Sequence, residues 1–153
     1  MDSRSDVLAA FDVDGTLTYW DTFPFFLWNM TGTVAFGWKS AALSSVLAQY
    51  ATGAISNESA KEQVICKFLG GRPIEEVTNR ARRFATDTMP CLVRGDAIDR
   101  LHWHQENGHS TVLVSASLEC YLRPWAQQIG VDMVVGTRLE TDGQCFTGCI
   151  KGK

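Results

Sequence analysis

The chain has 153 residues, enough for one medium-sized domain or two small ones, and 45% of them are hydrophobic, which excludes a disordered protein. Its formal net charge is -3 with a pI near 5.5, so the composition does not favour binding to nucleic acid or to anionic lipid. The five cysteines are odd in number and form no C-x-x-C pair, which argues against a disulfide framework and a structural zinc site and favours a reducing, cytoplasmic location.

The first predicted element is a strand that ends in two aspartates. The N-terminus has neither the basic start nor the long apolar core of a secretory signal, since Asp2, Arg4 and Asp6 precede only a short apolar run. Residues 7–11 are five consecutive apolar residues, which predicts a strand buried on both faces. Open α/β sheets bind ligands where such strands end, and this one runs directly into an acidic turn.

The acidic turn has the sequence Phe11-Asp12-Val13-Asp14-Gly15-Thr16-Leu17-Thr18. Side chains two apart on an extended backbone point the same way, so Asp12 and Asp14 are expected in one small volume, while Gly15 permits a sharp turn. Two carboxylates held that close must bind a metal, share a proton, or do both. Ordinary Asp-Gly turn chemistry is the alternative interpretation of Asp14 and Gly15 taken alone.

A nearly uncharged, aromatic segment follows. Between Thr22 and Asn57 the only charged residue is Lys39. Polar and helix-breaking residues interrupt the segment, so it contains no nearly pure apolar run of about 20 residues such as a membrane span requires. We expect a helical subdomain over an active site, with interfacial membrane association as the less favoured alternative.

Helical periodicity continues from residue 17 to about residue 89. Three apolar stripes mark three helices, formed by Leu43, Val46, Leu47 and Tyr50, by Val64, Ile65, Phe68 and Leu69, and by Ile74, Val77, Ala81, Phe84 and Ala85. Asn57 or Ser59 can begin the second helix, since Ser59 with Glu62 matches a capping box, and Gly70-Gly71 ends it. The pattern predicts a small helical bundle.

The remainder alternates between helix and strand. A helix is expected after Pro90, followed by a buried strand over 111–114, a helix over 118–128 and a strand over 133–135. This order is typical of a parallel sheet. Residues 139–150 predict a hairpin around Asp142-Gly143. The predicted organisation is therefore a core over 1–18, a helical insertion over 19–91 and a continued core over 92–153.

The acidic turn resembles the first motif of the haloacid dehalogenase superfamily of phosphotransferases, Asp-x-Asp-Gly-Thr-(Leu/Val)-Thr after a hydrophobic strand. Val114-Ser115-Ala116-Ser117 is similar to the second motif, a Ser or Thr at the end of the second core strand, and the helical insertion resembles the cap of the phosphoserine phosphatase branch. Weaker similarities occur at 136–140 and 146–148. The resemblance implies an α/β fold, an incomplete doubly wound, Rossmann-like parallel sheet with an inserted α-helical cap.

The resemblance also implies a Mg²⁺-dependent phosphomonoester hydrolase acting on a small phosphorylated substrate. Asp12 would attack phosphorus and form an aspartyl-phosphate, while Asp14 would protonate the leaving oxygen and then activate water. Asp12 would bind Mg²⁺ through its carboxylate and Asp14 through its backbone carbonyl. Ser115 would donate its hydroxyl to a phosphate oxygen, assisted by the backbone N–H groups of Val13, Asp14 and Ala116.

Two of these assignments compete with structural interpretations. Ser115 could cap the helix expected near Leu118, although Ser117 suits that capping role better. Asp21 stands where phosphoserine phosphatases carry a Glu that contacts the substrate amine, but it is also placed to cap the next helix, the interpretation we favour.

The superfamily's later motifs are not recognisable. Its third motif, a Lys, and its fourth, an acidic pair that completes the Mg²⁺ shell, have no counterpart, and Lys151 and Lys153 come too early to replace the Lys. We therefore expect a truncated, weakly active phosphatase with exposed sheet edges that allow self-association. The alternative hypothesis is a non-catalytic pseudo-phosphatase that binds a phosphorylated ligand or a protein partner.

Overall fold

The computed structural model describes residues 7–151, so the predictions made for Asp2, Arg4, Asp6 and Lys153 lie outside the described residues. The described chain divides into two compact units. Unit 1 comprises residues 7–25 and 81–137, and unit 2 comprises 26–80 and 138–151. The divisions fall within the helices α1 (Thr22–Thr31) and α5 (Ile74–Arg83) and after residue 137. The units are described separately.

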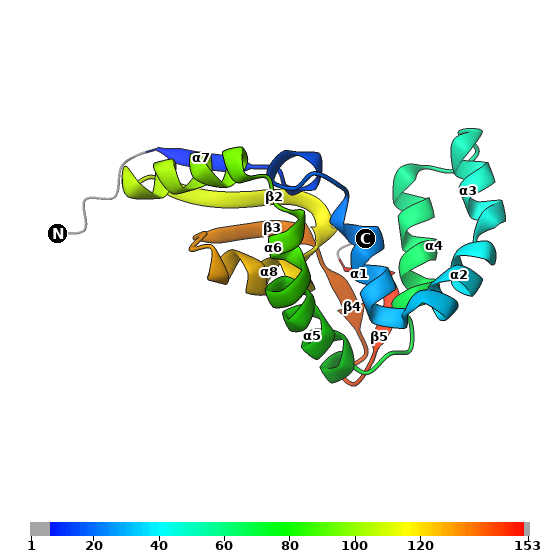
Figure 1. Cartoon of the computed structure of the whole chain (residues 1–153). Helices are drawn as coiled ribbons and strands as arrows, with labels where there is room; N and C mark the ends of the chain where they lie inside the picture. The colour runs from blue at the N-terminus through cyan, green and yellow to red at the C-terminus, as the bar shows by residue number, and fades with distance from the viewer. Residues whose placement is uncertain (1–6, 152–153) are drawn as a thin grey trace. The chain divides into compact units, whose positions relative to one another are not determined.

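Unit 1 is built on a parallel three-stranded sheet in the order β1-β2-β3 (Figure 1). Its strands are β1 (Leu8–Phe11), β2 (Ser110–Leu118) and β3 (Met133–Thr137). Phe11 pairs with Leu113, and Val114 pairs with Val135, so the ends of all three strands lie at the same edge. The parallel α/β arrangement predicted from the sequence is confirmed.

The two faces of this sheet differ. Ala9, Thr111 and Leu113 lie on a buried face, where α7 (Gly95–Glu106) and α8 (Glu119–Gln128) pack. On the opposite face Leu8 and Val135 are each 57% exposed. The prediction that the first strand is buried on both faces is therefore wrong, because none of the helices within residues 7–151 covers these side chains.

Short segments surround the end of β1. A wide turn, η1 (Val13–Leu17), follows β1, and η2 (Phe84–Thr88) and α6 (Met89–Leu92) follow the end of α5 in the same unit. Backbone hydrogen bonds join these segments, since Tyr19 N–H donates to the Leu92 carbonyl at 2.9 Å and Arg94 N–H to the Leu17 carbonyl at 2.8 Å. The side chains of Leu17, Phe84 and Leu92 are buried here, so the turn after β1 is anchored in the core of unit 1.

Unit 2 combines helices with a hairpin. Besides its parts of α1 and α5, it contains α2 (Thr33–Ala41), α3 (Ser44–Ala51), α4 (Asn57–Leu69), β4 (Leu139–Thr141) and β5 (Phe146–Ile150). The predicted hairpin is confirmed, since β4 and β5 pair antiparallel. It packs on α4, so closely that a Cβ on Gly148 would lie 2.8 Å from the Cys66 Cα. The hairpin therefore groups with unit 2, whereas the sequence assigned it to the core over 92–153.

Two local predictions in unit 2 need correction. The cap of α4 is Ser56, whose hydroxyl accepts from Ser59 N–H at 3.1 Å, and not Asn57 or Ser59. In α3 only Val46 of the expected stripe is buried within the helix, and Leu47 and Tyr50 are exposed. None of the helices between residues 7 and 151 is long and apolar enough to cross a membrane.

Candidate active site

The turn after β1 sets the direction of both aspartates. Asp12 follows β1 directly with an extended backbone (φ -74, ψ 154). Asp14 has ψ 114, and Gly15 then takes a φ of +79, which residues with side chains rarely adopt. Thr18 closes the turn, because its backbone N–H and its hydroxyl both donate to the Val13 carbonyl at 3.0 Å. The sharp turn predicted at Gly15 is confirmed.

The Asp14 carboxylate receives four hydrogen bonds from two other segments of unit 1. Its Oδ1 accepts from the Thr22 backbone N–H at 2.8 Å and from the Thr22 hydroxyl at 2.7 Å. Its Oδ2 accepts from the Ser115 hydroxyl at 3.0 Å and from the Ser117 hydroxyl at 2.6 Å. This half-buried carboxylate is therefore fixed between the first residue of α1 and the end of β2.

Ser115 and Ser117 present their hydroxyls on the same side because they stand two residues apart on a strand. The Ser115 hydroxyl also accepts from Ser117 N–H at 2.9 Å, which holds the pair together. The prediction that Ser117 caps the next helix is wrong: β2 continues through Leu118, and α8 begins at Glu119 with no side-chain cap. Ser117 is instead a site residue, and its spacing of two from Ser115 was the signal that could have identified it.

Asp12 has a different environment from Asp14. It is exposed, and its Oδ2 accepts from the Thr16 hydroxyl at 2.8 Å within the same turn. A carboxylate that attacks an incoming group must be accessible, and a carboxylate that exchanges protons with that group must be held in a fixed orientation. Asp12 is thus the accessible carboxylate of this turn, and Asp14 is the carboxylate held by hydrogen bonds.

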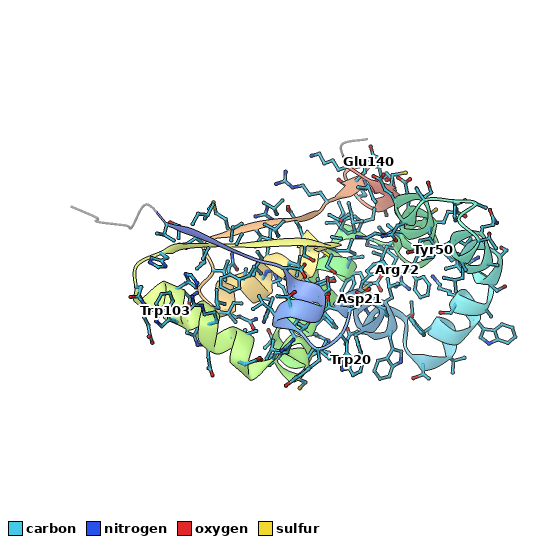
Figure 2. All side chains as sticks on the ribbon, turned by 90° about the horizontal axis from the view of Figure 1, so that it is seen from above. Trp20, Asp21, Tyr50, Arg72, Trp103 and Glu140 are labelled. Atoms are coloured by element: carbon cyan, nitrogen blue, oxygen red, sulfur yellow. The ribbon has the colours of Figure 1, made fainter. Side chains whose placement is uncertain are left out.

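The other predicted site residues lie in the turn after β1, on β2 and directly before α1. Val13 is buried, and Ala116 lies exposed between the two serines of β2. Asp21 Oδ1 accepts from Phe23 N–H at 2.9 Å in the first turn of α1, which is the geometry of a helix cap. Figure 2 shows Asp21 near the turn after β1, and Trp103 at the other end of unit 1.

Sequence reasoning missed Thr22 and Tyr121, which lie behind Asp14. The Tyr121 hydroxyl on α8 is 2.9 Å from Thr22 Oγ1, and both side chains are fully buried. Burial raises the pKa of Tyr121, so its hydroxyl stays protonated at neutral pH. The Phe84 ring meets the Tyr121 ring edge-on with centroids 5.2 Å apart, which fixes the direction of that hydroxyl.

Asp12 and Asp14 are the residues of this turn that could hold a divalent cation. Mg²⁺ prefers oxygen ligands, keeps several waters, and is often bound by one or two carboxylates together with substrate phosphate oxygens. The exposed Asp12 carboxylate and the Asp14 backbone carbonyl suit that chemistry and supply part of such a shell. Within residues 7–151 no three His, Cys, Asp or Glu side chains are grouped so that they could hold a metal ion.

Comparison with known proteins identifies the family. A family model for haloacid dehalogenase-like hydrolases matches residues 9–153. The chain belongs to the haloacid dehalogenase-like hydrolase family. The matched residues include the turn that carries Asp12 and Asp14 and the end of β2 that carries Ser115.

Individual relatives agree with this assignment. Protein CicA of Caulobacter vibrioides is 34% identical over 145 residues, which cover 93% of this chain and 64% of CicA. A protein of unknown function from Bordetella pertussis has a TM-score of 0.80 at 23% identity, with 97% of this chain and 68% of that chain covered. A phosphoserine phosphatase solved as a phospho-aspartyl intermediate analogue has a TM-score of 0.61 at 20% identity, with 95% and 63% covered.

The structural likeness places the fold of this haloacid dehalogenase-like hydrolase beside that of phosphoserine phosphatases, as the sequence predicted. The chain spans 64% of the length of the curated relatives that it matches.

Proposed function

We propose that this protein is a Mg²⁺-dependent phosphomonoester hydrolase that acts on a small phosphorylated substrate through an aspartyl-phosphate intermediate. The observation that carries the proposal is the pairing of an accessible Asp12 carboxylate with an immobilised Asp14 carboxylate two residues later, with the Ser115 hydroxyl 3.0 Å from Asp14. Family membership and the fold shared with phosphoserine phosphatases support the same reaction class.

In the proposed reaction an oxygen of Asp12 forms a bond to phosphorus while the bond from phosphorus to the ester oxygen breaks. Asp14 gives its proton to the leaving oxygen and becomes a carboxylate. In the second step Asp14 takes a proton from water, the resulting hydroxide attacks phosphorus, and the bond to Asp12 breaks, which releases inorganic phosphate.

Ser115 would exchange its hydrogen bond to Asp14 for one to a phosphate oxygen. Its hydroxyl already points into this turn, so the exchange needs rotation of one side chain only. Backbone N–H groups of Val13, Asp14 and Ala116 are the further phosphate donors that we propose. A Mg²⁺ ion bound by the Asp12 carboxylate and the Asp14 carbonyl would offset the negative charge of the phosphoryl oxygens.

The test is hydrolysis of p-nitrophenyl phosphate by the purified protein, with Mg²⁺ and with a chelator, comparing Asp12→Asn with wild type. Asp12→Asn should reduce turnover by about 10³-fold or more, because an amide neither attacks phosphorus nor binds the metal well. Acid quenching should trap a phosphorylated wild-type chain and no phosphorylated Asp12→Asn chain. Asp96→Asn, which removes one exposed carboxylate on α7 of the same unit, is the matched control.

Turnover of Asp12→Asn within a few-fold of wild type would show that another group is the nucleophile. Absence of hydrolysis by the wild-type protein, combined with saturable binding of a phosphate ester, would instead favour a non-catalytic ligand-binding protein.

A further inference from the structure

The helix α2 of unit 2 presents an apolar side outwards. None of its nine residues, all of which the structure describes, is buried. Val34, Trp38 and Ala41 lie on one face of the helix, because they are spaced four and three residues apart. All three are exposed, Val34 by 75% and Trp38 by 76%. A surface helix of a globular protein normally turns its apolar face towards the core, so α2 has the reverse orientation.

The opposite face of α2 packs on α4. The Phe36 ring lies against the Phe68 ring, with the two centroids 5.7 Å apart. Lys39, three residues further on, lies on the same side of α2, and its ammonium donates to the Lys67 carbonyl at 2.8 Å. Lys39 is the only charged residue between positions 22 and 57. The outward face of α2 therefore contains no charged residue.

The end of α1 extends this face. Trp28 is 48% exposed, and its indole N–H donates to the hydroxyl of Thr33, the first residue of α2, at 3.1 Å. We call the exposed side chains of Trp28, Val34, Trp38 and Ala41 the outer patch of unit 2. All other charged residues of unit 2 within the described range lie at 58–80 and 138–151, on other elements.

The composition of the outer patch suits a lipid surface better than a protein partner. Tryptophan is enriched at membrane–water interfaces, because one part of its side chain is apolar and the other can face water. The Trp28 N–H already has a partner within the chain, so burial of that ring would leave no donor unpaired. Protein interfaces are instead ringed by polar groups and enriched in Arg, whereas the only charge of this segment is bound at the Lys67 carbonyl.

Charge also indicates which lipid surface the outer patch fits. The chain has a formal net charge of -3 and the patch has no cation, so attraction to anionic headgroups would not drive the contact. The nine residues of α2 are far fewer than the roughly 20 that span a bilayer, so this helix would lie along the surface. The sequence alone favoured a packed helical subdomain, because periodicity does not show that these side chains are exposed.

We infer that the outer patch of unit 2 binds the surface of a zwitterionic lipid bilayer. The helix α2 lies in the plane of the interface, and Trp28, Val34 and Trp38 insert at the level of the headgroups. The inference concerns unit 2 and does not rest on the function proposed for the two aspartates.

The experiment measures co-sedimentation of the full chain with sucrose-loaded phosphatidylcholine vesicles. Half of the wild-type chain should be bound at roughly 0.1 to 1 mM lipid. Trp38→Ala should weaken binding roughly 10-fold, because it removes an aromatic ring that would leave water. Val34→Asp, which places a charge in the interface, should weaken it by at least roughly 10-fold. Both positions are exposed, so circular dichroism should show wild-type folding for each variant.

Trp103→Ala is the matched control, because Trp103 is a 44% exposed tryptophan of unit 1 that lies outside the outer patch. This variant should bind the vesicles as wild type does. Replacing about a third of the phosphatidylcholine with phosphatidylserine, or raising the salt concentration from about 0.1 M to about 0.5 M, should change wild-type binding by less than about 3-fold.

Three results with vesicles would overturn the inference. They are absence of wild-type binding at millimolar lipid, equal binding by wild type and Val34→Asp, and binding that requires phosphatidylserine and is lost at high salt. Dimerisation without vesicles that Trp38→Ala abolishes, combined with no vesicle binding, would show that the outer patch joins two copies of the chain and would also overturn it. The hydrolysis tests above are unaffected by any of these outcomes.

Discussion

The two units of this protein differ in what they bury. Within residues 7–151 the buried Ser, Thr and charged side chains are Thr18, Thr22, Thr111, Ser117 and Glu119, and all five belong to unit 1, as does the buried Tyr121. The buried side chains of unit 2 are apolar, and several of its aromatic residues, including Trp28 and Trp38, are exposed. Buried polar groups add little net stability but impose directions on their partners. The unit that contains the proposed chemistry is thus the one whose core fixes hydrogen-bond geometry.

The largest expected effect is the loss of turnover on replacing either aspartate of unit 1, and a second measurement, of stability, distinguishes the two variants. Asp12→Asn and Asp14→Asn should each reduce phosphatase turnover by about 10³-fold or more. Only Asp14→Asn should also destabilise the fold, by about 2 kcal/mol, because its four donors would face a neutral amide that can itself donate. Thermal unfolding measures the difference, and equal melting temperatures for both variants would show that the Asp14 network contributes nothing to stability.

A second pair of variants compares a buried tryptophan of unit 1 with an exposed one of unit 2. Trp125 on α8 is 1% exposed, whereas Trp38 on α2 is 76% exposed. Trp125→Ala should cost about 3–5 kcal/mol of unfolding free energy by opening a cavity. Trp38→Ala should change it by less than about 0.5 kcal/mol. Denaturant titration gives both values, and a large loss for Trp38→Ala would mean that this side chain is covered in solution.

Substitution of one glycine in each unit tests how closely that unit is packed. A Cβ on Gly136 would lie 2.9 Å from the Ser117 carbonyl oxygen in unit 1, and one on Gly148 would lie 2.8 Å from the Cys66 Cα in unit 2. Each Gly→Ala change should cost about 1–3 kcal/mol. Gly37→Ala is the control, since its Cβ meets nothing within 4 Å and a helical alanine should add about 0.5–1 kcal/mol.

Amide hydrogen exchange shows which elements lose stability in the two Gly→Ala variants. Gly136→Ala should weaken amide protection in β2 and β3, while Gly148→Ala should weaken it in α4 and β5. Loss of protection in the same elements for both variants would show that the two units unfold together.

The smallest effect concerns pH and the hairpin of unit 2. The backbone N–H groups of Cys145 and Gln144 donate to Asp142 Oδ1 at 2.7 and 2.9 Å, and they hold the pKa of Asp142 below its usual 3.8. The turn is therefore fully stabilised above pH about 4 and loses this contribution as the pH falls through the native pKa. Amide chemical shifts of residues 144 and 145 should report the change, and Asp142→Ala should abolish it. A midpoint of this chemical-shift titration above the pKa of an unfolded Asp would show that the turn raises the pKa of Asp142 and is destabilised at neutral pH.

The local sequence pattern predicted much of unit 1, because each of the features that identify it lies within a short run of neighbouring residues. The apolar run into Asp12, the turn at Gly15 and the strand ending near Ser115 each depend on a few neighbouring residues. Thr22 and Tyr121 escaped prediction because their contact joins residues 99 apart, and nothing in either local sequence indicates a partner. Ser117 was misassigned because β2 ends at Leu118, four residues beyond the predicted end of the strand at 114, so Ser117 lies on the strand and not at the start of the next helix.

Unit 2 shows a different limit of sequence reasoning. The apolar spacing in α3 correctly indicated a helix, but periodicity identifies a face without showing what covers it. Leu47 and Tyr50 therefore continue the predicted stripe and are nevertheless exposed. The hairpin at 139–150 was likewise recognised as a hairpin, while its packing against α4 depends on Cys66 and Gly148, which carry no pairing signal in the sequence.

The bond from Thr22 N–H to Asp14 makes one carboxylate the anchor for the start of α1 as well as the proposed proton carrier. A relative that had lost hydrolysis would still gain from an acceptor for the Thr22 N–H and hydroxyl, in addition to the Asp21 cap, so it would tend to keep Asp14. Asp12, which supports only the hydroxyl of Thr16, would be free to change. Under the proposed mechanism, Asp12 is therefore the residue expected to differ between active and inactive relatives, whereas Asp14 alone indicates only that this contact to α1 is retained.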